Sequence, residues 1–138
     1  MPHRAVFFDF GGTLFSYAEM RPHFDRMLQE LARRHRITAP MEEIRQVYRR
    51  TVARRMAEFL PRPFYLHREL FEEAHDDLLT ALGVDPNRSD QTSLYMGQTE
   101  VGLAAVQARE GVRDTLAALR HRGLHLGIVS NIDEDQFQ

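Results

Sequence analysis

The stretch Ala5–Phe15, which reads AVFFDFGGTLF, decides the fold that the rest of the sequence must fit. It opens with four apolar residues, reaches a carboxylate at Asp9 and then turns at Gly11-Gly12-Thr13. A short apolar run of bulky side chains that ends at glycines is typical of a buried parallel strand. Because the ligands of open α/β sheets collect outside the carboxyl ends of the strands, Asp9 is predicted to lie in such a crevice.

A second apolar run, Leu124–Val129, predicts another buried strand, which leads into Ser130 and Asn131. Between the two strands, apolar residues recur at helical spacing, and prolines and glycines interrupt the pattern. Together these signals predict helices over about residues 20–35, 38–60, 66–82, 89–109 and 112–122.

The order of the predicted elements indicates an α/β fold. Residues 1–18 and 110–138 are predicted to form an incomplete Rossmann-like core with two parallel strands, and residues 19–109 a four-helix cap inserted between them. Two strands with open edges are unstable by themselves. We therefore expect the cap helices, a further segment or a second copy of the chain in a homo-oligomer to cover them.

The composition narrows the class of protein. A formal net charge of −2 over 138 residues argues against a nucleic-acid partner, and the absence of cysteine excludes thiolate metal sites. The N-terminal segment is not a secretory signal, and no run approaches the roughly 20 apolar residues of a membrane span. We therefore expect no membrane association and a cytoplasmic location.

The segment Asp9–Leu14 resembles the first motif of the haloacid dehalogenase (HAD) superfamily of hydrolases, an Asp-x-Asp-Gly-Thr pattern after an apolar strand. Leu126–Asn131 is similar to the second motif of that family, an apolar strand that ends in Ser or Thr. The resemblance implies the family's Rossmann-like core and a helical cap inserted after the first motif.

The resemblance also implies roles for individual residues. Asp9 would be the catalytic nucleophile, and the hydroxyls of Thr13 and Ser130 would contact the group that is transferred. Gly12, Ser130 and Asn131 would bind the substrate, a small phosphorylated or otherwise activated metabolite. Mg²⁺ would be held by Asp9, the carbonyl of Gly11 and acids further downstream, because it prefers hard oxygen ligands.

Two departures from the family pattern leave the reaction open. Gly11 occupies the position of a second Asp, which protonates the leaving oxygen in the phosphatases, and losing a general acid costs about 10²–10⁴ in rate. The enzyme could therefore be phosphatase-like or dehalogenase-like. The Lys and the acidic pair of the third and fourth motifs do not occur in the eight residues after Ser130. We expect this chain to be the N-terminal part of a hydrolase, with little activity by itself.

A non-catalytic relative of the family is the alternative interpretation. Residues 21–68 hold twelve Arg against five Asp and Glu, so this helical segment could bind an anionic partner or another chain. The seven His show no metal-site spacing, and Asp133-Glu134-Asp135 is predicted to begin a helix.

Overall fold

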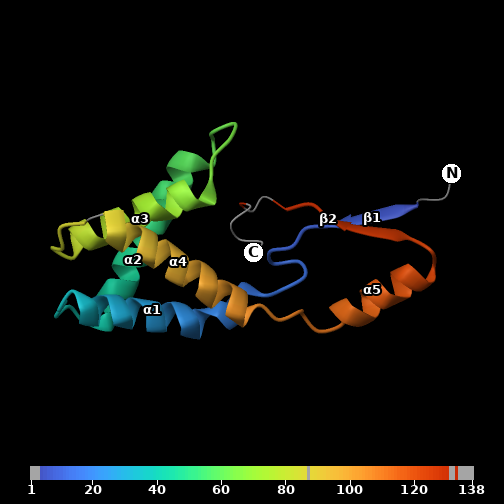
Figure 1. Cartoon of the computed structure of the whole chain (residues 1–138), viewed down its shortest axis with the longest axis horizontal. Coiled ribbons are helices and arrows are strands. Elements are labelled where there is room, and N and C mark those ends of the chain that lie inside the picture. Colours follow the sequence, from blue (N-terminus) through green and yellow to red (C-terminus); the bar gives the residue numbers. More distant parts are fainter. Residues whose placement is uncertain (1–3, 87, 131–132, 134–138) are drawn as a thin grey trace.

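The computed structural model describes residues 4–86, 88–130 and 133. It contains a helical unit and a strand unit that lie end to end and are joined by two segments (Figure 1). The elements in chain order are β1 (Ala5–Phe8), η1 (Tyr17–Met20), α1 (Arg21–Arg34), α2 (Met41–Phe59), α3 (His67–Ala81), α4 (Arg88–Ala105), α5 (Val112–His121) and β2 (His125–Ile128).

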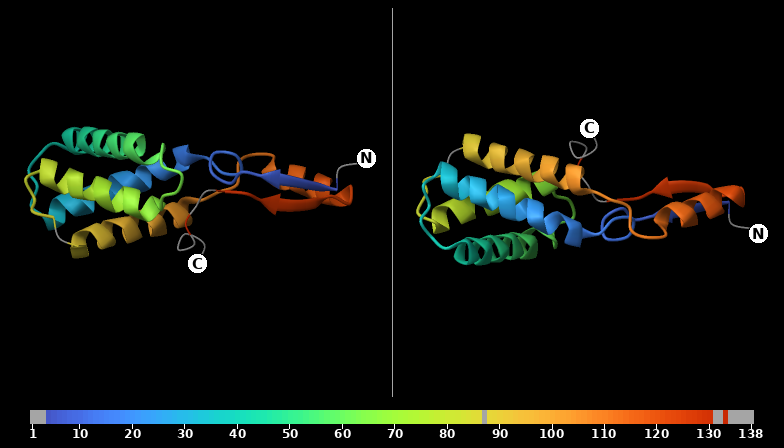
Figure 2. Two further views of the ribbon diagram at one scale, coloured as in Figure 1. Left: turned by 90° about the horizontal axis from the view of Figure 1, so that it is seen from above. Right: turned by 90° about the horizontal axis from the view of Figure 1, so that it is seen from below.

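The strand unit consists of β1, β2 and α5. The two strands pair in parallel, with Ala5 opposite His125 and Phe8 opposite Ile128. Both arrows point toward the helical unit, so the carboxyl ends of the strands face the helices (Figure 1). Helix α5 runs back along the strand pair and connects the segment after α4 to β2 (Figure 2). The predicted α/β architecture with two parallel strands is confirmed.

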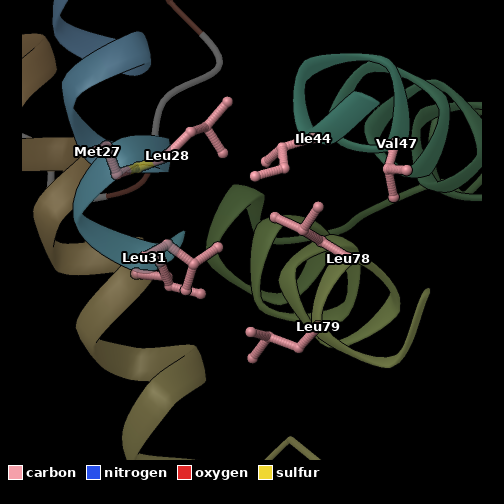
Figure 3. Close-up of a cluster of buried hydrophobic side chains, with 8 residues drawn as sticks. Met27, Leu28, Leu31, Ile44, Val47, Leu78 and Leu79 are labelled. Atoms are coloured by element: carbon pink, nitrogen blue, oxygen red, sulfur yellow. The ribbon is translucent and has the colours of Figure 1, made fainter. Parts of the chain in front are cut away.

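The helical unit has its own hydrophobic core. Side chains from α1, α2 and α3 point toward one another and exclude water (Figure 3). Ile44, Leu78 and Leu79 are fully buried there. The buried cluster comprises Met27, Leu28, Leu31, Ile44, Val47, Leu78, Leu79 and Leu94. This core fixes the positions of the helices whose other faces line the candidate site.

The strand unit buries much less apolar surface. No residue of α5 is buried, and the side chains of Phe7 and Val129 are 66% and 65% exposed. The main buried core of the described residues therefore lies among the helices. The pairing of β1 with β2, rather than a core of its own, organises the strand unit.

The predicted and observed helices differ most at the end of α4. The sequence predicts this helix to about Arg109, whereas α4 ends at Ala105. Residues after Ala105 instead run beside the segment that follows the first motif, where Phe15 and Ala108 form an antiparallel bridge. A contact between residues far apart in the sequence thus takes the place of the predicted last turn of α4.

A search of the described residues finds no helix with the length and apolar character needed to cross a membrane.

The helical core should depend strongly on Leu78, whose side chain is fully buried. We expect Leu78→Ala to lower the free energy of unfolding by about 2–5 kcal/mol, because it leaves a cavity between α1, α2 and α3. Urea unfolding followed by circular dichroism measures this change. Leu60→Ala is the matched control, since Leu60 is 58% exposed and its truncation should cost at most about 0.5 kcal/mol. Equal losses in the two variants would contradict the described core.

Candidate active site

Parallel pairing brings the two predicted motifs to the same edge of the strand pair. The N–H of Val129 donates to the carbonyl of Phe8 at 2.9 Å, so the pairing continues past the last residue of β2. Asp9 follows β1 directly, and Ser130 follows Val129. Asp9 is exposed and Ser130 half-buried. Asn131, which is predicted to bind the substrate, lies outside the described residues.

The loop after Asp9 folds back over its carboxylate. The Thr13 hydroxyl donates to Oδ2 of Asp9 at 3.3 Å, and the N–H of Leu14 donates to the carbonyl of Phe10 at 2.9 Å. Gly12 has a φ of +75°, a left-handed conformation that favours glycine. The structure therefore brings together two of the predicted catalytic residues, Asp9 and Thr13.

Arg109 holds this loop from the opposite segment. Its guanidinium donates to the carbonyl of Gly12 at 2.7 Å, and its main-chain N–H donates to the carbonyl of Leu14 at 2.9 Å. This contact was not predicted, because Arg109 was expected to end a helix. The residues around Arg109 give no local signal for a contact with a loop almost a hundred residues earlier.

Tyr17 fills the space that a side chain at position 11 would occupy. A Cβ atom added to Gly11 would collide with the Tyr17 hydroxyl and lie 3.1 Å from Cζ of the same ring. The ring packs edge-on against Phe15, with 5.0 Å between the centroids. The absence of a side chain at Gly11 thus makes room for the phenol.

A cavity of about 340 Å³ lies between the first motif and the helices. Phe10 and Gly11 of the first motif line it. Asp9 and Thr13 of the same motif do not line it, and neither does Ser130 of the second motif. The rest of its described wall is mostly aromatic and aliphatic: Phe15, Tyr17, Met20, Phe24, Tyr48, Met56, Tyr65, His67, Leu70, Phe71, Gln98, Thr99, Gly102 and Val106. A cavity of this size and lining suits a small, largely apolar molecule.

Three polar side chains from different helices meet beside this cavity. The Tyr48 hydroxyl donates to Oε1 of Gln98 at 3.1 Å, and Nε2 of His75 lies 3.2 Å from the same oxygen. The His75 ring stacks on Tyr48 with 6.3 Å between the centroids. Burial lowers the pKa of His75 to about 4, and burial also raises the pKa of Tyr48. Both groups are therefore neutral at physiological pH.

Asp133 links the segment after β2 to the helical unit. Its two carboxylate oxygens accept hydrogen bonds from the main-chain N–H groups of His67, at 3.1 Å, and Arg68, at 2.8 Å. These residues begin α3, where a negative charge is favourable because of the helix dipole. Asp133 was predicted to begin a helix of its own, and residues 134–138 lie outside the described residues.

Ion pairs neutralise much of the arginine-rich segment. Arg54 and Arg55 of α2 both pair with Asp77 of α3. Burial alone would raise the pKa of Asp77, but the hydrogen bonds from these arginines lower it overall. Other pairs are Arg33–Glu30, Arg45–Asp25, Arg49–Glu42, Arg55–Glu73 and Arg68–Glu72. The segment therefore offers an anionic partner less charge than its composition indicates.

The described residues do not complete a magnesium site. Asp9 and the carbonyl of Gly11 are the predicted ligands, but no three His, Asp or Glu side chains of the described residues are grouped so that they could hold a metal ion. Mg²⁺ demands near-octahedral oxygen coordination. The metal stays a prediction from the family resemblance.

Comparison with known proteins identifies the family of the chain. The family model of haloacid dehalogenase-like hydrolases matches residues 3–138, and the chain therefore belongs to this family of hydrolases. Comparison with curated proteins gives no significant match.

Solved structures share the fold. A defluorinating L-2-haloacid dehalogenase is 22% identical, with a TM-score of 0.61 over 97% of this chain and 53% of that one. The L-2-haloacid dehalogenase from Xanthobacter autotrophicus, with chloropropionic acid covalently bound, is also 22% identical, with a TM-score of 0.57 over 99% of this chain and 50% of that one. The chain thus spans about half the length of these proteins.

Burial of His75 should make the stability of the protein depend on pH. The unfolded chain takes up a proton near pH 6.5, whereas the folded chain does so only near pH 4. The contribution of the neutral His75 ring to the free energy of unfolding is therefore fully present above about pH 6.5. The free energy of unfolding should fall by roughly 3 kcal/mol as the pH is lowered to 4. Urea unfolding at a series of pH values measures the loss.

Two variants separate this effect from the titration of carboxylates. His75→Gln should lose less stability over the same pH range, while replacement of an exposed histidine, His121→Gln, should leave the loss unchanged. An identical pH dependence in the wild type and His75→Gln would show that His75 is not buried as a neutral ring.

Proposed function

We propose that the protein is a hydrolase that removes halide from a small organic halide, with Asp9 as the nucleophile. The observation that carries this proposal is the aromatic cavity beside Gly11, whose described lining contains no Arg or Lys. Because the chain spans about half of its solved relatives, the proposal concerns the activity of the whole protein. The names of those relatives, L-2-haloacid dehalogenases, lend support to this reaction class.

The proposed reaction has two steps. An oxygen of the Asp9 carboxylate attacks the carbon that bears the halogen; a carbon–oxygen bond forms, and the halide leaves with the bonding electrons. Water then attacks the carbonyl of the resulting ester, which releases an alcohol and a proton and restores the carboxylate. A halide needs no proton to leave, so the reaction tolerates glycine at position 11.

Other residues would orient the reacting groups. The Thr13 hydroxyl, already bonded to Asp9, fixes one carboxylate oxygen and leaves the other for attack. Ser130, Gly12 and Asn131 stay predicted contacts of the substrate or the leaving group.

A phosphorylated metabolite is the second candidate substrate. The bond between Thr13 and Asp9 supports it, because phosphoryl transfer depends on donors placed around the nucleophile. A dianionic phosphoryl group, however, is costly to place beside an apolar wall without cations. Within this class, an acyl phosphate is favoured, since its leaving group needs little help from an acid.

The nucleophile can be tested directly in the whole protein. We expect halide release from a panel of small organic halides, measured with and without a chelator, and we expect Asp9→Asn to lower it by at least about 10³-fold, because the amide cannot form the ester. Mass spectrometry of the peptide that contains Asp9 should detect the ester after rapid quenching.

Thr13→Val is an informative companion, since it removes the hydroxyl that orients Asp9 and should reduce the rate while the nucleophile is kept. Release of phosphate from acetyl phosphate without any release of halide would select the second substrate class. Turnover that survives Asp9→Asn would overturn both.

A further inference from the structure

The cavity wall contains one polar side chain that hydrogen bonds from two other helices hold in place, and the proposed reaction does not use it. Most of its described wall is apolar, with seven Phe and Tyr rings, and none of its described residues is Arg, Lys, Asp or Glu. Gln98, from α4, places an amide in this wall. An amide fixed in a largely apolar wall is well suited to discriminate between ligands, because an unmatched polar group in such a place is costly.

Two neighbours hold the carbonyl end of this amide. Tyr48 of α2 donates its hydroxyl to Oε1 of Gln98, and His75 of α3 approaches the same oxygen with Nε2. His75 is fully buried, so its ring cannot turn toward water. The amide is therefore clamped between two other helices.

The buried ring of His75 decides which end of the amide faces the cavity. Its other nitrogen, Nδ1, is buried without a hydrogen-bond partner. A proton on Nδ1 would be an orphaned buried donor, whereas a proton on Nε2 leaves only a lone pair unmatched, which costs less. Nε2–H thus donates to Oε1 of Gln98. With Tyr48 it occupies both lone pairs of that oxygen, and the NH₂ group is left for a ligand.

We infer that Gln98, fixed by Tyr48 and His75, is a specificity-determining hydrogen-bond donor of the cavity, and that it recognises a neutral acceptor on an otherwise apolar substrate. A carbonyl, amide or ether oxygen fits this description. A carboxylate fits less well, because the described wall contains no Arg or Lys to compensate for its loss of water. The inference rests on the proposed function for the identity of the reacting bond and narrows its substrates to neutral halides.

Binding tests the inference without turnover. Acetophenone and α-methylstyrene have nearly the same shape, but only acetophenone carries a carbonyl oxygen. Their affinities are measured by NMR titration of the Asp9→Asn protein. When Gln98→Met is added, the preference for acetophenone over α-methylstyrene should fall by about 3- to 10-fold, the worth of one neutral hydrogen bond.

Matched variants complete the experiment. Gln46→Met, on an exposed position of α2, should leave the preference unchanged. Tyr48→Phe keeps the ring and frees one lone pair of Gln98, so it should weaken the preference in part, and it provides the test if Gln98→Met does not fold. A preference that is unaltered in both Gln98→Met and Tyr48→Phe overturns the inference.

Turnover separates this inference from the proposed function. Halide release from 2-chloro-2-phenylacetamide should exceed that from 2-chloro-2-phenylacetate, and Gln98→Met should remove the difference. If neither compound releases halide while the binding preference still depends on Gln98, the proposed reaction fails and the inferred recognition stands. Preference for the carboxylate in turnover overturns the inference alone.

Discussion

The parallel pairing of β1 with β2 is the constraint on which the candidate site depends. A one-residue shift in this register would turn every side chain of a strand to its opposite face. The observed register, with Phe8 opposite Ile128, brings the residues after both strands to one edge. The chain leaves β1 for the helical unit at that edge and returns beside it before α5 carries it back to the start of β2, and Arg109 fastens the returning segment to the loop after Asp9. Asp9, the proposed nucleophile, is thus positioned by main-chain pairing rather than by burial of its own side chain.

The distribution of burial between the two units explains where the cavity lies. The helices form a core of their own, so their positions relative to one another do not depend on the strands. The strand unit exposes much of its apolar surface and contributes the motif loop. The cavity forms where this loop meets the helices. Asp133 adds a second connection between the units, because its carboxylate binds the first N–H groups of α3.

Much of this fold could be predicted from local signals in the sequence. Gly83 and Gly123 adopt the left-handed conformation that ends helices, and the apolar runs marked both strands. The proximity of the two motif segments followed from the rule for parallel strands, although the catalytic roles of their residues stay predictions. Contacts between distant residues could not be foreseen. Tyr48 and Gln98 are 50 positions apart, and each alone looks like an ordinary residue of an amphipathic helix.

Gly11 and the apolar cavity are consistent with one kind of chemistry. An acid at position 11 is useful when a poor leaving group must be protonated, and a cationic wall is useful when the substrate carries a phosphate. The described cavity has neither: the phenol of Tyr17 occupies the space beside Gly11, and the wall is largely apolar and contains no Arg or Lys. The same features that disfavour phosphomonoester hydrolysis therefore favour displacement of a leaving group that departs as a stable anion.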